Sequence, residues 1–436
     1  MDVSEYIDAV TSQMRCKRAR DTVAKELSDH ISDQTEDYLL AGMSPQVAAR
    51  EAVHQMGDAA EVGMEMDRLH RPRLDRKTLV MIGIFTLIAL LVQTMIEQVI
   101  RRSGDLSADA RMIPLQVAVG ILIMVGILYL DYTILGKYPL TLWILLLILP
   151  ILLKNMRNGG IFLARIDRVI LYLLLGFMLP AYVGVIYRYR RKGWLGLFCS
   201  VVWLLAGMFV YRGLLNRFFL IGLVGFAGLL LLSYALAKGW YGIPKLSALA
   251  VLWGGILTII LLIFLLGIEG NGFSDYQMTR LGAFFHYTEL QGEGGYITFH
   301  MRETMRDFTF LHPVREWFRG GNFIGYPIEY ALSFFIILFQ MGILPGVLLI
   351  CGFVVLFLCM ARGVSKQKNI LGSLLGMACV LALIIPTVGH LLSCLSLIPY
   401  TDVYIPFLYP GWIANASSYT LLGLYLSVYR YTDVVA

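Results

Sequence analysis

The chain has 436 residues, of which 58% are hydrophobic and only 15% are charged. Soluble domains carry about 25% charged residues, so the composition excludes an ordinary soluble protein and predicts an all-α, polytopic membrane protein. The net charge of +6 comes largely from basic clusters in the predicted loops, which set membrane topology. We therefore do not infer nucleic-acid binding. The six cysteines form no CxxC pair, which argues against a thiolate metal site.

Residues 1–75 are predicted to form a small cytosolic helical domain. Apolar residues recur at helical spacing in two stretches before Gly42, which ends the second helix. Ser44 and Pro45 are suited to the N-cap and first residue of a third helix, and a fourth follows Asp58. The run GMSPQVAAREAVHQMGDAAEVG resembles the permease prefix domain that precedes many bacterial membrane proteins. The resemblance implies no activity, and leaves a docking module and a stability appendage both open.

Residues 76–436 are predicted to be a ten-span membrane domain, because a span needs about 20 mostly apolar residues. The apolar segments lie at roughly 78–99, 113–135, 139–154, 166–187, 194–211, 216–237, 246–268, 328–361, 370–397 and 404–429. Basic clusters precede the first span and follow the fourth and eighth. Because cytoplasmic loops carry the excess of Lys and Arg, we expect both termini to be cytoplasmic, in a bacterial cytoplasmic (inner) membrane.

One long interruption, residues 269–327, separates the seventh and eighth spans. With ten spans and cytoplasmic ends it lies outside. A long loop in a compact chain is usually functional or disordered, and this one is too aromatic to be typical of disorder. We therefore expect recognition or chemistry here.

Few polar side chains fall within the predicted spans. Ionisable groups in a membrane are candidates for function, but most of these are near span ends, where solvation at the interface is the simpler explanation. His390 lies deeper, where a hydrogen-bonded structural histidine is favoured. The set comprises Glu97, Asp131, Asp167, His390 and Asn415.

The C-terminal stretch LIPYTDVYIPFLYPGWIANASSYTLLGLYLSVYR, residues 397–430, carries a family motif. It resembles the SEDS family (shape, elongation, division and sporulation proteins, the FtsW, RodA and SpoVE group), whose pattern is LP-x-TG-x-x-LPF-x-S-x-GGSS. The matching positions include Thr401 and Pro406, while Asp402 stands where the family has glycine. The prolines cannot continue a helix, so we expect an irregular segment at the outer face before the last span.

The resemblance implies ten spans, cytoplasmic ends and one large outer loop, the arrangement predicted above. Tyr276, Arg280 and the GEGGYITF run that contains Tyr296 resemble family elements of that loop. The chain is a divergent member by this comparison, because the catalytic aspartate of the family aligns on Ala331. The nearest carboxylate is Glu329.

SEDS proteins polymerise lipid-linked disaccharide into peptidoglycan strands, so the resemblance implies a lipid-linked sugar diphosphate as substrate. That reaction needs a base and positive charge at the leaving diphosphate. Glu329 is the candidate base, although a carboxylate there could simply cap the helix; three loop histidines, His286, His300 and His312, are weaker candidates. The expected substrate-binding residues are Arg280, Arg302, Arg306, Tyr296, Thr401 and Pro406.

No cofactor is predicted with certainty. A divalent cation, Mg²⁺ or Mn²⁺, could share the diphosphate with carboxylates such as Glu289, Glu293 or Asp307. A class B penicillin-binding transpeptidase is implied as partner by the resemblance, besides membrane lipids. The alternative to a glycosyltransferase is a non-catalytic SEDS-like scaffold or lipid-binding partner in envelope assembly. A transporter is disfavoured, because the spans contain no series of charged residues that could act as a relay.

Overall fold

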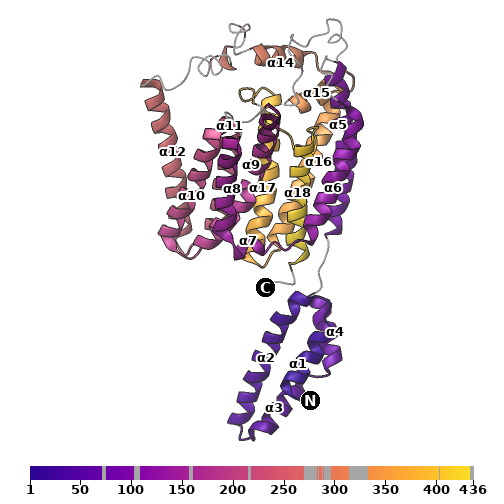
Figure 1. Cartoon of the computed structure of the whole chain (residues 1–436), viewed down its shortest axis with the longest axis vertical. Helices are drawn as coiled ribbons and strands as arrows, with labels where there is room; N and C mark the ends of the chain where they lie inside the picture. The colour runs from indigo at the N-terminus through magenta and orange to yellow at the C-terminus, as the bar shows by residue number, and fades with distance from the viewer. Residues whose placement is uncertain are drawn as a thin grey trace.

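The computed structural model describes residues 1–70, 75–102, 109–156, 161–214, 218–269, 282, 284–286, 288, 296–313, 332–401 and 403–432. Over these residues the chain consists of helices and connecting turns, with no β-strand. Figure 1 shows a small helical bundle at the N-terminus and a larger bundle of near-parallel helices.

The N-terminal bundle has its own apolar core. Apolar side chains at a spacing of four residues, Ala19, Val23, Leu27 and Ile31, are buried along the second helix, as expected for an amphipathic helix. They pack with Tyr6 and other side chains of the first helix. The four helices are α1 (Val3–Ser12), α2 (Lys17–Leu40), α3 (Pro45–Gln55) and α4 (Ala59–Leu69).

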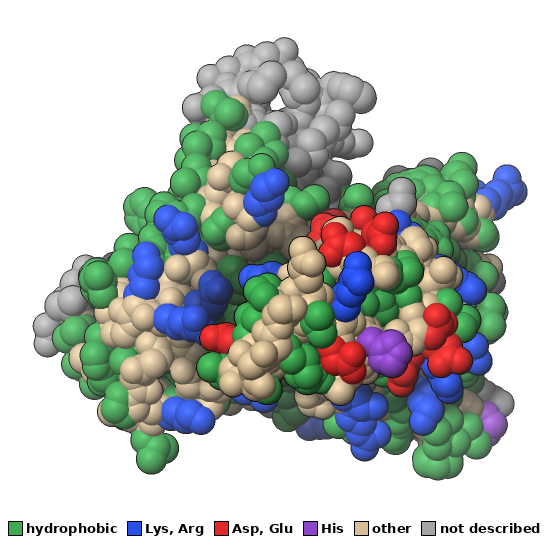
Figure 2. Space-filling view, turned by 90° about the horizontal axis from the view of Figure 1, so that it is seen from below, with side chains coloured by type: hydrophobic (Ala, Val, Ile, Leu, Met, Phe, Trp, Pro, Cys, Tyr) green, Lys and Arg blue, Asp and Glu red, His purple; other side chains and the backbone are tan. Residues whose placement is uncertain are grey.

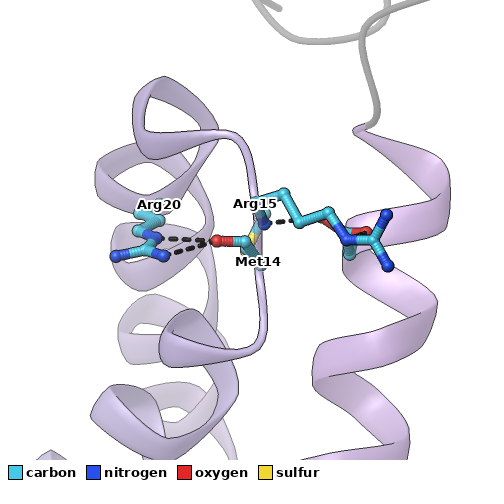
Figure 3. A network of polar contacts seen from close by, with 4 residues as sticks. Met14, Arg15 and Arg20 are labelled. Atoms are coloured by element: carbon cyan, nitrogen blue, oxygen red, sulfur yellow. Dashed lines mark hydrogen bonds and ion pairs between the residues drawn. The ribbon is translucent and has the colours of Figure 1, made fainter.

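The turn between α1 and α2 is fixed by a small polar network (Figure 3). The Arg20 guanidinium donates from Nε and Nη2 to the Met14 carbonyl oxygen, at 2.9 and 2.6 Å. The Arg15 backbone N–H donates to Asp67 of α4 at 2.7 Å. Gly63 lets α4 approach α1 closely, since a Cβ there would lie 2.7 Å from the Val10 oxygen. These contacts hold the first and last helices of the bundle together.

The large bundle contains ten helical passes over the described residues, and they alternate in direction (Figure 1). The eighth pass is made of two helices, and a short helix, α7 (Ile134–Lys137), precedes the third. The passes are α5 (Arg76–Arg102), α6 (Ile113–Tyr129), α8 (Pro139–Met156), α9 (Ile161–Tyr189), α10 (Gly193–Leu214), α11 (Phe218–Ala237), α12 (Lys245–Glu269), α15 (Ser333–Met341) with α16 (Ile343–Ser365), α17 (Ile370–Cys394) and α18 (Trp412–Arg430).

Seven helices among the described residues are long and apolar enough to cross a membrane, and two shorter apolar helices fall in α8 and α9. The all-α, polytopic membrane fold is thereby confirmed. The last helix, α18, is less apolar because it faces protein rather than lipid. Most of its residues are buried, including Asn415, Ser417, Ser418 and Ser427. A helix surrounded by other helices can carry polar groups that bond within the bundle.

The helices α6 and α18 pack closely against each other. A Cβ on Gly120 of α6 would lie 2.4 Å from the Tyr419 ring, and a Cβ on Gly423 of α18 would lie 2.8 Å from the Met124 oxygen. Small residues on both helices therefore let the two backbones approach, as is common in membranes, where helix association depends on close packing.

The predicted eighth span, 328–361, differs from the structure because the helix is broken at Gly342. Gly342 has a φ of +90°, which favours glycine. The amide N–H groups of Ile343 and Leu344, which open α16, donate to the carbonyl oxygens of Thr309 and Phe310 at 3.0 Å each. The segment 307–313 thus satisfies donors that an uninterrupted helix would have paired internally.

Two other span boundaries also differ from the prediction. The second span was expected to reach residue 135, but α6 ends at Tyr129, and Asp131 accepts from the Thr133 N–H at 2.7 Å in the turn that follows. The tenth was expected from residue 404, but α18 begins at Trp412. Pro406 and Pro410 lie in the intervening stretch, where proline disfavours a helix.

The two ends of the large bundle are named here by one feature of each. The end at which α5 begins and α18 finishes, called here the basic end, is rich in Lys and Arg; Figure 2 shows many of them. They are Arg76, Lys77, Lys137, Arg188, Arg190, Arg191, Lys192, Lys238, Lys245, Arg362, Lys366, Lys368 and Arg430. At the opposite end a separate helix, α14 (Tyr296–Arg306), lies across the bundle (Figure 1). We call this the α14 end.

Candidate functional site

The candidate site is built around the segment 395–411, which joins α17 to α18 at the α14 end and is described except for residue 402. The segment has no regular helix, and two of its non-glycine residues, Ser396 and Phe407, have positive φ values of 54° and 66°. Such conformations are uncommon for these residues and persist where surrounding contacts enforce them. An irregular segment before the last span was predicted from its prolines, and the structure confirms it.

His390 of α17 ties three parts of this region together. Its side chain is fully buried. Nδ1 lies 2.6 Å from the Val403 carbonyl oxygen, and Nε2 lies 3.2 Å from the Phe334 backbone nitrogen. Because the Phe334 N–H can only donate, Nε2 is the acceptor and Nδ1 carries the proton that is donated to Val403. His390 is therefore a structural histidine, as predicted, that joins α17, α15 and the segment.

A second anchor is a pair of amides buried between α5 and α18. Asn415 Nδ2 donates to Gln93 Oε1 at 3.1 Å, and Gln93 Nε2 donates to Asn415 Oδ1 at 2.9 Å. Gln93 Nε2 also donates to the Phe407 carbonyl oxygen at 2.5 Å. The Phe407 N–H in turn donates to Ser418 Oγ at 3.3 Å. The strained residue of the segment is thus held on both sides by buried polar groups.

Beside the segment lies an apolar cleft between α9, α11 and α17. Its volume is about 40 Å³, room for about three water molecules at the ~10–15 Å³ that each requires. The residues from α11 and α17 belong to the half of the bundle nearer α14. Tyr404 of the segment 395–411 also lines the cleft. The lining comprises Leu175, Gly176, Leu179, Leu220, Leu223, Val224, Ala227, Leu381, Ala382, Ile385, Pro386 and Tyr404.

The helix α14 places a cationic side chain on the same segment. Met301 and Thr298 are buried against the bundle, as expected for an amphipathic helix lying along an interface. Arg302 Nη2 donates to the Ser396 carbonyl oxygen at 3.2 Å, and the guanidinium carbon lies 5.0 Å from the centre of the Phe284 ring. Arg302 therefore belongs to the site, as an anchor between α14 and the segment.

The other predicted site residues fall in different places. Arg306 is exposed and pairs with Glu303 at 2.9 Å. Thr401 and Pro406 both lie in the segment 395–411; the Thr401 N–H donates to Ser393 Oγ at 2.9 Å. The Thr401 Oγ1 atom is buried and has no hydrogen-bond partner in the part of the chain that the structure describes. Tyr296 begins α14. Arg280 and Glu329 lie outside the described residues.

No group of three or more His, Cys, Asp or Glu side chains that could hold a metal ion occurs within the described residues. Of the carboxylates considered for a divalent cation, Asp307 follows α14, whereas Glu289 and Glu293 lie outside that part of the chain. Among the loop histidines, His286 and His312 are exposed. Burial lowers the pKa of the His300 imidazole from its ordinary value of 6.5, while the nearby Glu303 carboxylate opposes that shift.

Two residues of the site were not singled out from the sequence. Gln93 lies in the middle of an apolar span, and its polarity was a usable signal, because buried amides in membranes need partners. Tyr404 gave no such signal, since the segment contains other tyrosines. Its place on the cleft depends on the positive φ of Phe407 and on contacts from distant helices.

Comparisons with known proteins identify a similar fold. No family model matches the chain, and no curated protein matches it. Among solved structures, one chain of a peptidoglycan synthase complex, described as coordinating polymerization and crosslinking, is similar to 82% of this chain over 98% of its own length. The TM-score is 0.60 and the sequence identity is 13%. The chain therefore has a helical membrane fold similar to that of a component of a peptidoglycan synthase complex.

Proposed function

We propose that this protein acts in bacterial cell-wall assembly, where it binds a lipid-linked sugar diphosphate and transfers its sugar to a growing peptidoglycan strand. The observation that carries the proposal is the apolar cleft bordered by Tyr404, on a segment that Arg302 also contacts. A lipid-linked sugar is apolar along its tail and anionic at its diphosphate, so an apolar cleft and a cation that both contact the segment 395–411 suit its two parts. The fold similarity supports the same assignment.

The cleft would hold the part of the tail nearest the diphosphate. Its volume of about 40 Å³ is too small for a whole polyprenyl chain, so the remaining tail would extend from the cleft into the surrounding lipid. No side chain that lines the cleft is charged. Burying apolar tail surface there contributes about 25 cal/mol for each Å² removed from water.

The polar end would lie at the α14 end. Arg302 has a planar guanidinium, whose N–H groups suit phosphate oxygens, and the Thr401 hydroxyl group has no hydrogen-bond partner among the described residues. In glycosyl transfer a base removes the proton from the acceptor sugar hydroxyl, the new C–O bond forms at the donor sugar, and the bond to the diphosphate breaks. Glu329 is the proposed base, and positive charge stabilises the departing polyprenyl diphosphate.

A second candidate function is that of a non-catalytic scaffold that binds the same lipid. The observation that favours it is Ala331, which stands where the SEDS family carries its catalytic aspartate. In this case the cleft and Arg302 would still bind the lipid, but no polymer would form.

The discriminating experiment gives purified protein a lipid-linked disaccharide with Mg²⁺ or Mn²⁺ and follows glycan polymer on gels. The proposal predicts polymer that is lost in Glu329→Gln while lipid binding remains. Polymer that persists in Glu329→Gln would assign the base to another residue. Binding without polymer in the unmodified protein would establish the scaffold, and the absence of both would reject this assignment.

Lipid binding can be tested separately with two matched pairs of variants. Ala382→Phe fills the cleft, whereas Leu257→Phe enlarges an exposed side chain of α12. We expect the first to weaken binding at least about tenfold, a loss of about 1.4 kcal/mol, and the second to leave it unchanged. Arg302→Gln should weaken binding more than Arg306→Gln, because Arg306 is engaged in an exposed pair with Glu303.

The membrane orientation and the partner are part of the same proposal. The basic end would face the cytoplasm, which gives cytoplasmic termini in the inner membrane and an outward-facing α14. A class B penicillin-binding transpeptidase is the proposed partner. Co-purification from cells that express both proteins would support it, and recovery of this protein alone after mild cross-linking would count against it.

A further inference from the structure

The basic end contains a hollow at some distance from the candidate site. Its volume is about 510 Å³. It is formed by the turn between α9 and α10, the turn between α11 and α12, and the start of α17. The lining residues are Arg191, Gly193, Gly239, Trp240, Tyr241, Gly242 and Ile370.

Backbone hydrogen bonds lock the two turns against each other. The Arg191 N–H donates to the Trp240 carbonyl oxygen at 2.9 Å, and the Gly193 N–H donates to the Tyr241 carbonyl oxygen at 3.1 Å. Four residues of these turns, Arg191, Gly193, Gly239 and Gly242, have φ values between 59° and 76°. Arg191 is the only one with a side chain, so its backbone is held in a conformation that is unusual for arginine.

Arg191 lines the hollow, two lysines of the same turns lie close to its other lining residues, and no carboxylate occurs in either turn. Lys245 lies over Gly239, with its Cε 3.2 Å from where a Cβ would be. Lys238 lies over the Tyr234 ring at 5.6 Å, and that ring meets the Trp240 ring edge-on at 5.7 Å. The turn sequences RYRRKG (188–193) and KGWYGIPK (238–245) contain six cations and no Asp or Glu.

The apolar surroundings distinguish this hollow from a solvated cluster of basic residues. Trp194 and Leu195, at the start of α10, and Leu246, at the start of α12, are 46%, 68% and 85% exposed. These side chains follow directly on the two turns that form the hollow. A ligand here would meet cations at its polar part and apolar helix surface at the rest.

We propose that the hollow binds the phosphate of an anionic phospholipid, with the acyl chains lying against α10 and α12. Tryptophan at a membrane interface and Lys or Arg beside it are typical of headgroup contact. Each basic residue near an anionic membrane surface contributes about 1 kcal/mol, and the fixed backbone of the two turns limits the ordering required on binding. This inference is independent of the proposed enzymatic function.

The test titrates the full-length protein, purified in a neutral detergent, with short-chain phosphatidylglycerol and follows tryptophan fluorescence. Parallel titrations use short-chain phosphatidylcholine, which has no net charge, and inorganic phosphate, which has no acyl chains. We expect saturable binding of phosphatidylglycerol and at least tenfold weaker binding of the other two. Equal binding of phosphatidylcholine would overturn the anionic site, and equal binding of inorganic phosphate would overturn the lipid.

Two triple variants, each of which removes three positive charges, test whether the lipid binds at the hollow. Arg191→Asn, Lys238→Gln and Lys245→Gln together remove the cations of the hollow; asparagine tolerates the positive φ at residue 191. Arg76→Gln, Lys77→Gln and Arg362→Gln remove three cations from the same end, on α5 and α16 across the bundle (Figure 1). We expect the first to weaken binding about 100-fold and the second less than about threefold.

Equal weakening by both triples would show only general attraction to a basic surface and would overturn the proposal. Unchanged binding in the hollow variant would overturn it as well. Thermal unfolding of each variant checks that it is folded. If the hollow triple does not fold, Lys245→Gln alone, at an exposed position, is expected to weaken binding about fivefold, and no effect would again reject the site.

Discussion

The two last helices of the bundle, α17 and α18, contrast with α12 at its margin. In α12 only 11% of the span is buried by protein, and the helix is almost wholly apolar; in α17 the buried share is 61%. His390, Asn415 and three serines of α18 are buried. Polar groups thus occur where other helices surround them, and His390, Asn415 and Ser418 are hydrogen-bonded there to the irregular segment 395–411. The difference shows that the residues of a lipid-facing helix are selected for being apolar, whereas the central helices also carry polar residues that form hydrogen bonds inside the bundle.

The largest effect is expected from His390→Leu. Loss of the imidazole leaves the Phe334 N–H and the Val403 carbonyl without the partners they now have. Each buried polar group left unpaired costs about 1–3 kcal/mol, so the free energy of unfolding should fall by about 2–6 kcal/mol. Thermal unfolding followed by tryptophan fluorescence measures it. A change below about 0.5 kcal/mol would show that water replaces the imidazole.

The amide pair between α5 and α18 allows a direct comparison of a buried polar group with an exposed one on α12. Asn415→Leu should destabilise the protein by about 1–3 kcal/mol, because it leaves the Gln93 amide without its partner. Thr258→Leu on exposed α12 removes an exposed hydroxyl that donates only to the Gly254 carbonyl oxygen of its own helix, and should be neutral.

The double variant Gln93→Leu/Asn415→Leu tests the coupling. Replacing both partners removes the unpaired amide, so the double variant should be less destabilised than the sum of the two single changes. Strict additivity in thermal unfolding would mean that the two amides act independently, against the geometry.

A smaller difference in stability is expected from changes in helix packing, between α18 and α12. Gly423→Ala would bring a Cβ within 2.8 Å of the Met124 oxygen, whereas nothing lies within 4 Å of a Cβ on Gly254 of α12. Overpacking typically costs 1–3 kcal/mol, so we expect about 1 kcal/mol for Gly423→Ala and none for Gly254→Ala. Equal midpoints of thermal unfolding for the two variants would contradict the close approach of α6 and α18.

The smallest expected effect concerns α14. Burial lowers the pKa of His300 below 6.5 in the folded protein, so the unfolded or undocked chain binds a proton first as the pH falls. The associated stability is present above pH 6.5 and decreases as the pH falls further. Amide exchange in α14, corrected for intrinsic rates, should therefore increase between pH 7 and pH 5. His300→Gln should show less of this increase, and an identical profile would assign the effect to another group.

The sequence predicted those features of the fold that depend on residues close together in the chain. Apolar length predicted ten passes, and Pro406 predicted the irregular segment before the last helix. The break at Gly342 was not predicted, because it depends on carbonyl groups of residues 309 and 310, more than thirty residues earlier. The cleft also escaped prediction, since its lining comes from three helices and Tyr404. Arg302 was predicted as a site residue from its charge; its contact with Ser396 required the fold.

The central position of α18 has a consequence for biosynthesis. Asn415 pairs with Gln93 across a sequence separation of 322 residues. At about 5–20 residues per second, the ribosome needs roughly 16–64 s to make that stretch. Throughout this time Gln93 has been synthesised but its partner has not. Until α18 inserts, the nascent bundle exposes a polar centre whose partner is absent. Quality-control proteases and insertion factors therefore have this interval in which to recognise the protein.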